Sequence, residues 1–526
     1  MAYYKELRDQ ILALEEKGLL VRIKGEINKD TELMPLVRLQ FRGLPEKERK
    51  AFLFENVIDA KGRKYNSSVL VGAHAASKEV YAVGLKCPLE AIGKTWAKAR
   101  ENHIEPVLRE TGSAQEEVHI GDSLMEHGGV DEFPIPISTP GFDNAPYLTA
   151  GNWISKDPET GIRNVGNYRG MIKSPTRIGI CNEMPKDLRV SWEKCRKMGK
   201  PLEAAIAIGP VPAVAYCATL RLPYDVDEMA VSGGLAGEPI PVVKCKSIDM
   251  EVPATSEVVF EGELPTDAME REGPFGEYTG FMAPETIGPY FNIKCITHRK
   301  NPVFNTFLSQ FPPSESTTLR SVGQEANLYK FLRDDVGVPV VEVAMHEAAS
   351  IQPYVVVSIK KTHPSQSWQV LNGVVSLYNF VKFAVVVDDD IDPRNADSVN
   401  WAIAWRVQAK RDIRIVEGIV SELDPSIGPP EGERTAYPMP SGSSAALIDA
   451  TTKWDYPPVS LPKKVFMERA REIWKEEGLP ELRLTKPWYG YDMGFWTEEF
   501  NEEAELAVKG DYYITGEKLA KKRTKL

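Results

Sequence analysis

The most informative stretch of this chain is residues 270–280, which read EREGPFGEYTG. Two acids, Glu272 and Glu277, flank a Gly-Pro-Phe-Gly corner, and in a flat strand their odd spacing would send them to opposite faces. The glycines and Pro274 can instead turn the chain, so that both carboxylates point into one cavity. Two acids beside an arginine can hold different protonation states, which proton-transfer chemistry requires. The alternative is an ordinary turn with two solvated glutamates.

A second segment lies about a hundred residues upstream and favours the chemical interpretation. It is residues 163–171, RNVGNYRGM, a turn-like start followed by a predicted strand. Together the two segments resemble the UbiD family of prenylated-flavin-dependent decarboxylases. The family pattern is Asn-x-Gly-x-Tyr-Arg, followed later by a Glu-Gly-Pro-x-Gly-Glu/Asp-x-x-Gly turn. The resemblance places the family's catalytic arginine and two acids on Arg169, Glu272 and Glu277.

The resemblance extends over nearly the whole chain. Its further pieces are short and occur in the family's order: residues 4–8, 20–23, 52–57, 387–392 and 448–453. Each piece alone is weak, but their order and separation make the likeness to the family strong.

Length and composition describe an ordinary globular protein. With 526 residues, 42% of them hydrophobic and 26% charged, the chain is too long for one core and indicates two or three domains. The net charge of −11 argues against nucleic acid as a partner, and the basic residues 518–526 are expected to be a solvated terminus. Six scattered cysteines without a CxxC pair suit a reducing cytoplasm. With no apolar signal core, the sequence predicts a soluble cytoplasmic protein without membrane contact.

Periodicity and turn residues predict a mixed α/β (α+β) fold of three domains. Residues 1–120 combine an amphipathic helix over 3–18 with short strands and further helices, which indicates an α/β domain. Residues 121–315 alternate short β-rich runs with proline and glycine, as antiparallel barrels do, and the resemblance implies a split β-barrel that holds the flavin. Residues 316–526 begin with a predicted linker helix and continue as an α/β domain, which by resemblance makes the oligomer contacts.

Several segments carry specific structural expectations. The apolar run 204–220 is predicted to form buried strands. The glycine-rich stretch 232–237 is predicted to be a loop, because no βαβ unit surrounds it. Apolar runs separated by predicted helices indicate parallel strands covered on both faces, at 340–345, 354–359 and 383–387. Two further helices are expected near 463–476 and 498–508.

Some polar residues are expected to be structural. Asp388, Asp389 and Asp390 follow a predicted strand, where acids more often cap the next helix or bind arginines than hold a metal. His346 and His363 are isolated, and isolated histidines are usually structural.

Decarboxylation of an aromatic or α,β-unsaturated acid needs an electron sink, a group that holds the carboxylate and a proton donor. No motif in the sequence provides a self-sufficient sink, so a bound organic cofactor must carry the difficult step. The resemblance names this cofactor as prenylated FMN. Arg169 is then expected to face carboxylate groups and the flavin, held in place by an ionised Glu272. Glu277 is expected to protonate the product carbon after CO2 leaves.

The resemblance also implies a divalent cation, Mn²⁺ or Mg²⁺, and a potassium ion at the cofactor phosphate. Asn164 and Glu228 match the family's divalent-ion ligands, and Lys382 matches its phosphate-binding lysine. Tyr168, next to Arg169, belongs to the same cofactor-binding motif. The main-chain carbonyls expected at the ions are those of Val165, Cys217, Ala218 and Leu220.

The sequence departs from the family pattern at one metal ligand. The family's metal-binding histidine should lie sixteen to eighteen residues after Arg169, but Pro185, Lys186 and Asp187 stand there. Either an oxygen donor such as Asp187 or Glu183 substitutes, or the divalent site is altered or lost. Hard oxygen donors would favour Mg²⁺ or Mn²⁺ over softer ions.

The expected reaction is non-oxidative, reversible decarboxylation of an aromatic, heteroaromatic or aryl-CoA carboxylic acid. The resemblance places substrate-pocket residues at Phe281, Met282, Pro438 and Met439, an apolar lining that suits a planar ring without selecting one. The implied partners are a flavin prenyltransferase, which supplies the cofactor, and further copies of the chain in a dimer or hexamer. Two alternatives remain open: a carboxylase subunit working in the CO2-fixing direction, and a flavin-binding protein without decarboxylase activity.

Overall fold

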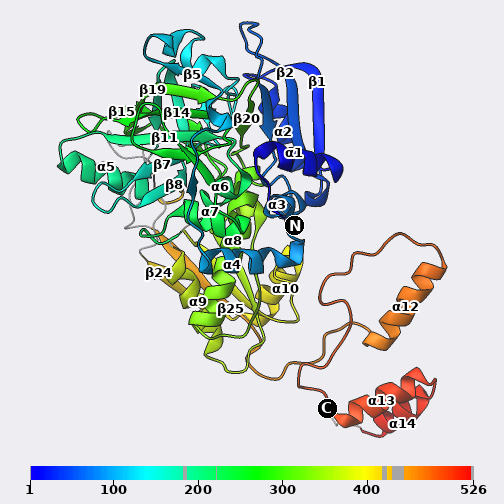
Figure 1. Ribbon diagram of the computed structural model, residues 1–526. Coiled ribbons are helices and arrows are strands. Elements are labelled where there is room, and N and C mark those ends of the chain that lie inside the picture. The colour runs from blue at the N-terminus through cyan, green and yellow to red at the C-terminus, as the bar shows by residue number, and fades with distance from the viewer. Residues whose placement is uncertain are drawn as a thin grey trace.

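The N-terminal part of the chain folds as a four-stranded sheet with helices packed against it (Figure 1). The computed structural model describes residues 2–181, 186–220, 222–378, 380–417, 423–428 and 443–522. The elements of the N-terminal part are α1 (Leu7–Glu16), β1 (Leu20–Asn28), α2 (Leu33–Gly43), β2 (Ala51–Ile58), β3 (Ser68–Val71), α3 (Lys78–Leu85) and α4 (Ile92–Glu101). The amphipathic helix predicted over 3–18 is α1, which buries Leu7, Ile11 and Leu14. It ends before Gly18, whose φ of +68° favours glycine.

A strand from much later in the chain completes this sheet. The strand order is β1-β2-β3-β20, and β20 (Val303–Thr306) pairs in parallel with β3. Because β20 follows the last long strand of the central sheet, the chain ties the N-terminal and central parts together at this edge.

The central part is a nine-stranded antiparallel sheet that curls into a half-barrel, which confirms the predicted split-barrel fold. Eight of its strands have the order β6-β9-β10-β19-β14-β11-β7-β8. The ninth, β5, pairs with the C-terminal residues of β19, whereas β10 pairs with the N-terminal residues of the same strand. The strands are β5 (Glu117–Ile120), β6 (Tyr147–Leu148), β7 (Asn152–Lys156), β8 (Arg163–Asn167), β9 (Gly170–Ser174), β10 (Arg177–Ile180), β11 (Leu202–Ile208), β14 (Val258–Leu264) and β19 (Tyr290–His298). Alternate residues of β11 serve two cores: Ile206 packs beside α5 (Asp187–Lys197), and Ala205 packs on the opposite side of the sheet.

The prediction of strands throughout 204–220 is wrong in its second half. The run begins in β11 and continues, after a turn, as helix α6 (Pro212–Cys217). Pro212 occupies the first helical position, where no N–H donor is needed and a fixed φ favours helix.

The prediction of a loop at 232–237 is also wrong, because most of this stretch lies inside helix α7 (Glu228–Ala236). Asp227 caps the helix by accepting a hydrogen bond from the N–H of Met229. The glycines allow close packing, since a Cβ on Gly233 would lie 2.2 Å from the carbonyl oxygen of Ile104. Glycine therefore indicates tight helix packing here and not a turn.

The C-terminal part begins with α8 (Glu315–Lys330), the predicted linker helix, which continues into one π-helical turn, η6 (Phe331–Asp335). Its sheet has the order β21-β22-β23-β25-β24. The remaining elements are β21 (Val340–Met345), β22 (Tyr354–Ile359), α9 (Gln366–Leu377), β23 (Phe383–Asp388), α10 (Ala396–Arg406), α11 (Ala409–Asp412), β24 (Ile413–Glu417) and β25 (Ser444–Ala450). As predicted, β22 and β23 are parallel, with α9 on one face of the sheet and α10 on the other.

One strand of this sheet runs against the prediction. β21 pairs antiparallel with β22, although a parallel strand was expected at 340–345. Only eight residues, 346–353, connect the two strands, with room for a single turn of 3₁₀ helix. A parallel crossover needs a dozen residues or more, so the short connection imposes the antiparallel direction.

Two of the acids at the end of β23, Asp388 and Asp390, bind an arginine, as expected. Arg406 is buried, and its Nη2 lies 2.6 Å from a carboxylate oxygen of Asp390, while Nη1 lies 3.2 Å from Asp388. His346 is structural, with Nε2 2.9 Å from the carbonyl oxygen of Pro393.

Three helices close the described chain and stand apart from its body (Figure 1). They are α12 (Lys464–Glu476), α13 (Glu498–Val508) and α14 (Tyr512–Lys521), and the first two lie where helices were predicted. None of the three contributes a buried residue. Among the described residues, no helix combines the length and apolar character needed to cross a membrane.

Candidate active site

The two predicted acids lie on a compact hairpin. Its two ladders pair β15 (Glu270–Glu272) with β18 (Thr286–Gly288), and β16 (Phe275–Gly276) with β17 (Met282–Ala283). At the corner between β15 and β16, Gly273 has a φ of +101°, a conformation that side chains with a Cβ rarely adopt. This corner breaks the alternation of the strand, and Glu272 and Glu277 consequently both turn toward Arg169.

Arg169 lies between β8 and β9 and binds both acids. Its Nε lies 2.9 Å from Oε1 of Glu272 and its Nη2 lies 2.7 Å from Oε2, so this pair is bidentate. The remaining nitrogen, Nη1, donates to Oε1 of Glu277. The guanidinium carbon lies 5.2 Å from the ring centre of Phe275. The structure thus brings together three residues that the sequence separates by about a hundred positions.

The two acids use their oxygens differently. The side chain of Glu272 has 0% exposure, and both of its oxygens accept hydrogen bonds from Arg169. Glu277 is 11% exposed and gives one oxygen to Arg169. Its other oxygen accepts a long 3.3 Å hydrogen bond from the N–H of Tyr278. Glu277 therefore keeps one oxygen that can accept a further hydrogen bond or carry a proton, whereas both oxygens of Glu272 are bound by Arg169.

Arg169 is held as a cation. Burial alone lowers the pKa of Arg169, but Cys181 and the two carboxylates raise it well above its ordinary value. A permanently charged, planar guanidinium in a buried position can bind a carboxylate or stabilise the negative charge of a neighbouring acid.

Asp143 is a buried acid at this site that sequence reasoning missed. Its two oxygens accept hydrogen bonds from the N–H groups of Gly276, at 2.9 Å, and Thr139, at 2.6 Å. Burial, with a smaller contribution from Glu277, raises the pKa of Asp143 to about 6, although the two main-chain hydrogen bonds and Arg169 act to lower it. Asp143 thereby fixes the main chain next to Glu277. Its only sequence signal is a place after a Pro-Gly turn, which cannot reveal a partner 133 positions away.

A second group of predicted residues gathers where β8 meets α7. Glu228 opens α7, and its Oε2 accepts a 2.8 Å hydrogen bond from the N–H of Val165. Asn164 is buried, and its side chain is close enough to Tyr168 to oppose the rise in the pKa of that phenol that burial causes. Burial, with smaller contributions from Asp187 and Asp227, raises the pKa of Glu228 to about 8. A cation here would compensate the buried carboxylate.

Asp187 stands where the family histidine was expected. It begins α5 and raises the pKa of Glu228 and, after burial, that of Tyr168, so it lies close to both side chains. This location agrees with a role as the substituting oxygen donor. The other candidate, Glu183, lies outside the described residues.

Three of the predicted carbonyl ligands, Cys217, Ala218 and Leu220, lie at the end of α6 and in the turn after it, whereas Val165 is on β8. The carbonyl oxygen of Ala218 accepts a 2.9 Å hydrogen bond from the N–H of Asn167, and that of Cys217 accepts a 3.0 Å bond from Leu220. Burial raises the pKa of the Cys217 thiol to about 12, and Glu228 adds to this effect. The turn therefore lies beside Glu228. Each carbonyl keeps a second lone pair that can bind an ion.

Three family models match the chain one after another. They are described as the N-terminal, Rift-related and C-terminal domains of 3-octaprenyl-4-hydroxybenzoate carboxy-lyase, and they match residues 11–100, 107–311 and 317–450. The phenolic acid decarboxylase of Sedimentibacter hydroxybenzoicus is 31% identical to the chain, over 91% of this chain and 98% of that protein. The chain belongs to the UbiD family of carboxy-lyases.

Solved UbiD-class structures share the fold. The UbiD-class enzyme HmfF from Pelotomaculum thermopropionicum, solved in complex with FMN, has a TM-score of 0.75 and 30% identity, covering 89% of this chain and 99% of its own. The vanillic acid decarboxylase of Sedimentibacter hydroxybenzoicus, in closed form, has a TM-score of 0.75 and 27% identity, covering 90% and 100%. The predicted family and fold class are confirmed.

Other predicted site residues of this UbiD chain lie in less defined surroundings. Lys382 forms an ion pair with Asp424, 2.8 Å away, so a phosphate would have to share or replace that partner. Phe281 is 59% exposed and Met282 is half-buried. The remaining pocket candidates, Pro438 and Met439, lie outside the described residues.

The acid hairpin also contacts the C-terminal part. Tyr278 packs against the core of the C-terminal sheet, and the guanidinium carbon of Arg320, on α8, lies 4.8 Å from its ring centre. Glu277 therefore lies where the central and C-terminal parts of the UbiD fold meet.

A cavity of about 840 Å³ lies elsewhere, between α4 and α8. Its lining includes Trp96, Asn327 and Tyr378, and of the predicted site residues it contains Leu220. Charged residues also line this cavity, but Arg169, Glu272 and Glu277 are not among them.

Proposed function

We propose that this chain is a non-oxidative, reversible decarboxylase of an aromatic, heteroaromatic or aryl-CoA carboxylic acid that uses prenylated FMN. The observation that carries the proposal is the buried cluster in which Arg169 forms a bidentate ion pair with Glu272 and binds one oxygen of Glu277. The phenolic acid decarboxylase and the FMN complex among the relatives support the substrate class and the cofactor.

The second group of residues fits the phosphate end of such a cofactor. Asn164, Glu228 and Asp187 offer oxygen donors for Mn²⁺ or Mg²⁺, and a cation there would compensate the buried Glu228 carboxylate. The carbonyls proposed for K⁺ are those of Cys217, Ala218 and Leu220, and the Val165 carbonyl is proposed to bind one of the two ions. Lys382 is proposed to bind the phosphate, and Tyr168 is proposed to line the cofactor site.

Bound prenylated FMN supplies the electron sink that the side chains lack. Arg169 orients the substrate carboxylate toward the site by its charge, and Glu272 keeps the guanidinium in one orientation. Glu277 carries the proton on the oxygen that Arg169 does not bind, and it transfers this proton to the carbon vacated by CO2. Arg169 then stabilises the resulting carboxylate. In the reverse direction, Glu277 takes the proton from the same carbon.

The proposed substrate pocket and assembly follow the family pattern. Phe281, Met282, Pro438 and Met439 are proposed to line the pocket for a planar ring. We retain the domains 1–120, 121–315 and 316–526, with β20 returning to the N-terminal sheet. Further copies of the chain, in a dimer or hexamer, are proposed to contact one another through the C-terminal part.

The decisive test is Glu277→Gln in protein made together with a flavin prenyltransferase. We expect normal folding and flavin content, but loss of turnover and of hydrogen exchange at the substrate carbon by at least about a hundredfold, because the amide cannot donate an acidic proton. Glu285→Gln is the matched control, since Glu285 lies on the same hairpin and pairs with the exposed Arg271. Full activity of the Glu277 variant would show that Glu277 is not the proton donor.

Substrate and direction need a separate experiment. Reconstituted enzyme should be offered a panel of aromatic acids and their CoA thioesters, with CO2 release measured. The corresponding products should be offered with labelled bicarbonate to measure carboxylation. Turnover of none of these compounds by flavin-loaded enzyme would favour a flavin-binding protein without decarboxylase activity.

A further inference from the structure

A cluster of imidazole and carboxylate groups lies outside the proposed active site, at the edge of the central sheet. His119 is on β5 and His298 ends β19, with His119 directly opposite Ile296 in the antiparallel ladder. The two-residue offset between Ile296 and His298 puts both histidines on one face of the sheet. Both are buried, with 7% and 5% exposure, and their Nε2 atoms lie 3.0 Å apart.

Glu132, in the 3₁₀ turn η5 (Gly129–Glu132), faces both rings. One of its oxygens lies 3.7 Å from Nε2 of His119, and the other lies 3.5 Å from Nε2 of His298. These separations exceed normal hydrogen-bond lengths, and Oε2 of Glu132 is buried without a hydrogen-bond partner in the described chain. The side chain of Glu132 is 23% exposed, but a cation would give its buried oxygen the partner that it lacks.

The hydrogen bond of the second ring nitrogen of His298, Nδ1, determines which nitrogen of the neutral ring carries the proton. Nδ1 of His298 lies 2.8 Å from the carbonyl oxygen of Arg299, and only a protonated nitrogen can donate to a carbonyl. In the neutral ring, Nε2 therefore presents a lone pair to His119 and Glu132. An imidazole held by a backbone carbonyl through its other nitrogen is the usual arrangement of a metal ligand.

We propose that His119, Glu132 and His298 bind one zinc ion that fastens β5 and η5 to the end of β19. Two imidazoles and a carboxylate are a zinc ligand set, and ligands in tetrahedral positions around zinc are about 3.3 Å apart. The observed separations of 3.0, 3.5 and 3.7 Å bracket this value. Imidazole ligands disfavour Mg²⁺ and Ca²⁺, so this site differs chemically from the oxygen-rich group at Glu228.

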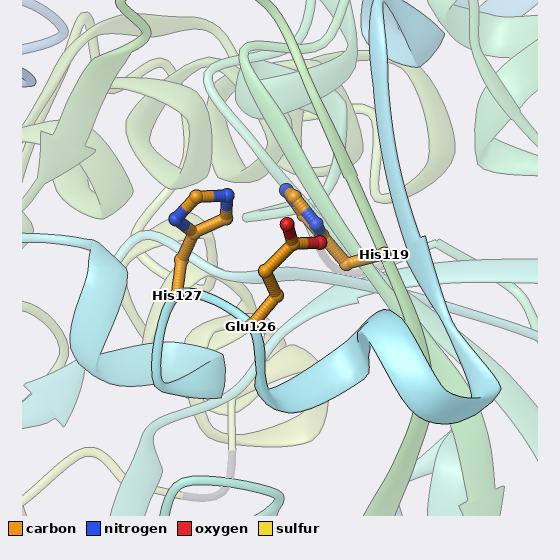
Figure 2. A group of neighbouring side chains, drawn as sticks. All are labelled: His119, Glu126 and His127. Atoms are coloured by element: carbon orange, nitrogen blue, oxygen red, sulfur yellow. The ribbon is translucent and has the colours of Figure 1, made fainter.

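Two exposed residues flank the site on its solvent side. Figure 2 shows the carboxylate of Glu126 between the rings of His127 and His119, and the candidate ligand atoms of these three residues all lie within 4.8 Å of one another. Water, Glu126 or His127 can fill the fourth position of the ion. His119, Glu132 and His298 are the required ligands.

Metal content of the full-length protein tests the proposal. After dialysis against micromolar zinc and desalting, elemental analysis should find about one zinc ion per chain in the wild type and in the control His363→Ala, whose histidine is remote and exposed. His119→Ala and Glu132→Gln should lose most of this zinc. His298→Cys should retain it, because a thiolate replaces the imidazole, and this rescue separates metal binding from a folding defect.

Spectroscopy distinguishes this ion from one at the proposed cofactor site. X-ray absorption at the zinc edge should show multiple scattering from imidazole, and Glu228→Gln should leave that signal unchanged. The proposal is overturned if the wild type binds no zinc, if His119→Ala binds as much as the wild type, or if the bound zinc has no imidazole ligand. Loss of zinc in His127→Ala, with zinc retained in His119→Ala and Glu132→Gln, would likewise reject this ligand set.

Discussion

At the residue scale, the chemistry of this UbiD chain depends on how one arginine divides its donors between two acids. Glu272 has no exposed surface and depends on Arg169 for compensation of its charge. Glu277 shares Arg169 but keeps one oxygen for another partner. The same cation therefore locks one carboxylate and leaves the other available for proton transfer.

Replacing Arg169 with methionine tests this dependence. We expect the free energy of unfolding to fall by about 3–5 kcal/mol, because Glu272 becomes a buried and uncompensated charge. Arg271→Met is the control, since Arg271 pairs with Glu285 at the surface, where ion pairs contribute at most about 1 kcal/mol. Urea unfolding followed by tryptophan fluorescence measures both, and equal losses in the two variants would contradict the argument.

Asp143 predicts a dependence of stability on pH. Its pKa is raised to about 6 in the folded chain, from an ordinary value of about 3.9 in the unfolded chain. Protonated Asp143 thus favours folding, and this contribution is complete below about pH 4 and lost as the pH rises through about 6. The difference in unfolding free energy between wild type and Asp143→Asn should fall by up to about 3 kcal/mol over this interval. A difference that stays constant from pH 4 to pH 7 would show that Asp143 does not titrate there.

At the scale of elements, α7 positions the proposed ion ligand by packing unusually close to its neighbours. Gly233 and Gly234 face the main chain after α4, where added Cβ atoms would lie 2.2 Å and 2.3 Å from the carbonyl oxygens of Ile104 and Asn102. Glu228 begins the same helix. Any displacement of α7 therefore moves Glu228 relative to β8.

Gly233→Ala should displace α7, because a backbone carbonyl cannot move aside as a flexible side chain could. We expect a loss of about 1–3 kcal/mol in unfolding free energy, together with weaker retention of flavin. Gly516→Ala in α14 is the matched control: nothing lies within 4 Å of its Cβ, and the change should stabilise the helix slightly. Thermal unfolding and bound-flavin absorbance report both effects. Normal flavin content in the Gly233 variant would show that the position of α7 does not affect cofactor binding.

At the scale of the whole molecule, the C-terminal helices expose apolar surface that the single chain does not cover. Val465 on α12 is 63% exposed and Tyr513 on α14 is 73% exposed, and Trp454, in the segment before α12, is 62% exposed. Large apolar side chains gathered on helices without a buried residue are typical of surfaces that pack against another molecule. This supports the proposal that further copies of the chain bind through the C-terminal part.

Removal of residues 454–526 should therefore reduce the size of the assembly. We expect light scattering after gel filtration to give a smaller mass per particle for the truncated protein than for the full chain. Val465→Asp should weaken the assembly in the same direction, while Lys464→Asp, an exposed neighbour, should not. If the truncated and full-length proteins contain the same number of copies, the contacts lie elsewhere.

The sequence by itself determined the family, the order of the parts and the identity of the charged residues. The motifs around Arg169 and Glu277 are local in the sequence, so the chemical type of their side chains can be identified without knowledge of the fold. The amphipathic helix at Leu7–Glu16 and the parallel strands β22 and β23 were predictable for the same reason, because periodicity is a property of neighbouring residues.

The tertiary structure alone decided what lies opposite each of these residues. Asp143 reaches the acid hairpin, and His119 reaches His298, only because strands distant in the chain become neighbours in one curled sheet. The sequence analysis also failed to predict the helix at 232–236, which depends on close packing beside Ile104. It failed to predict the antiparallel direction of β21, which depends on the length of the connection to β22. Local pattern specifies side-chain chemistry, but long-range packing specifies which groups share a site, and therefore which charges compensate one another.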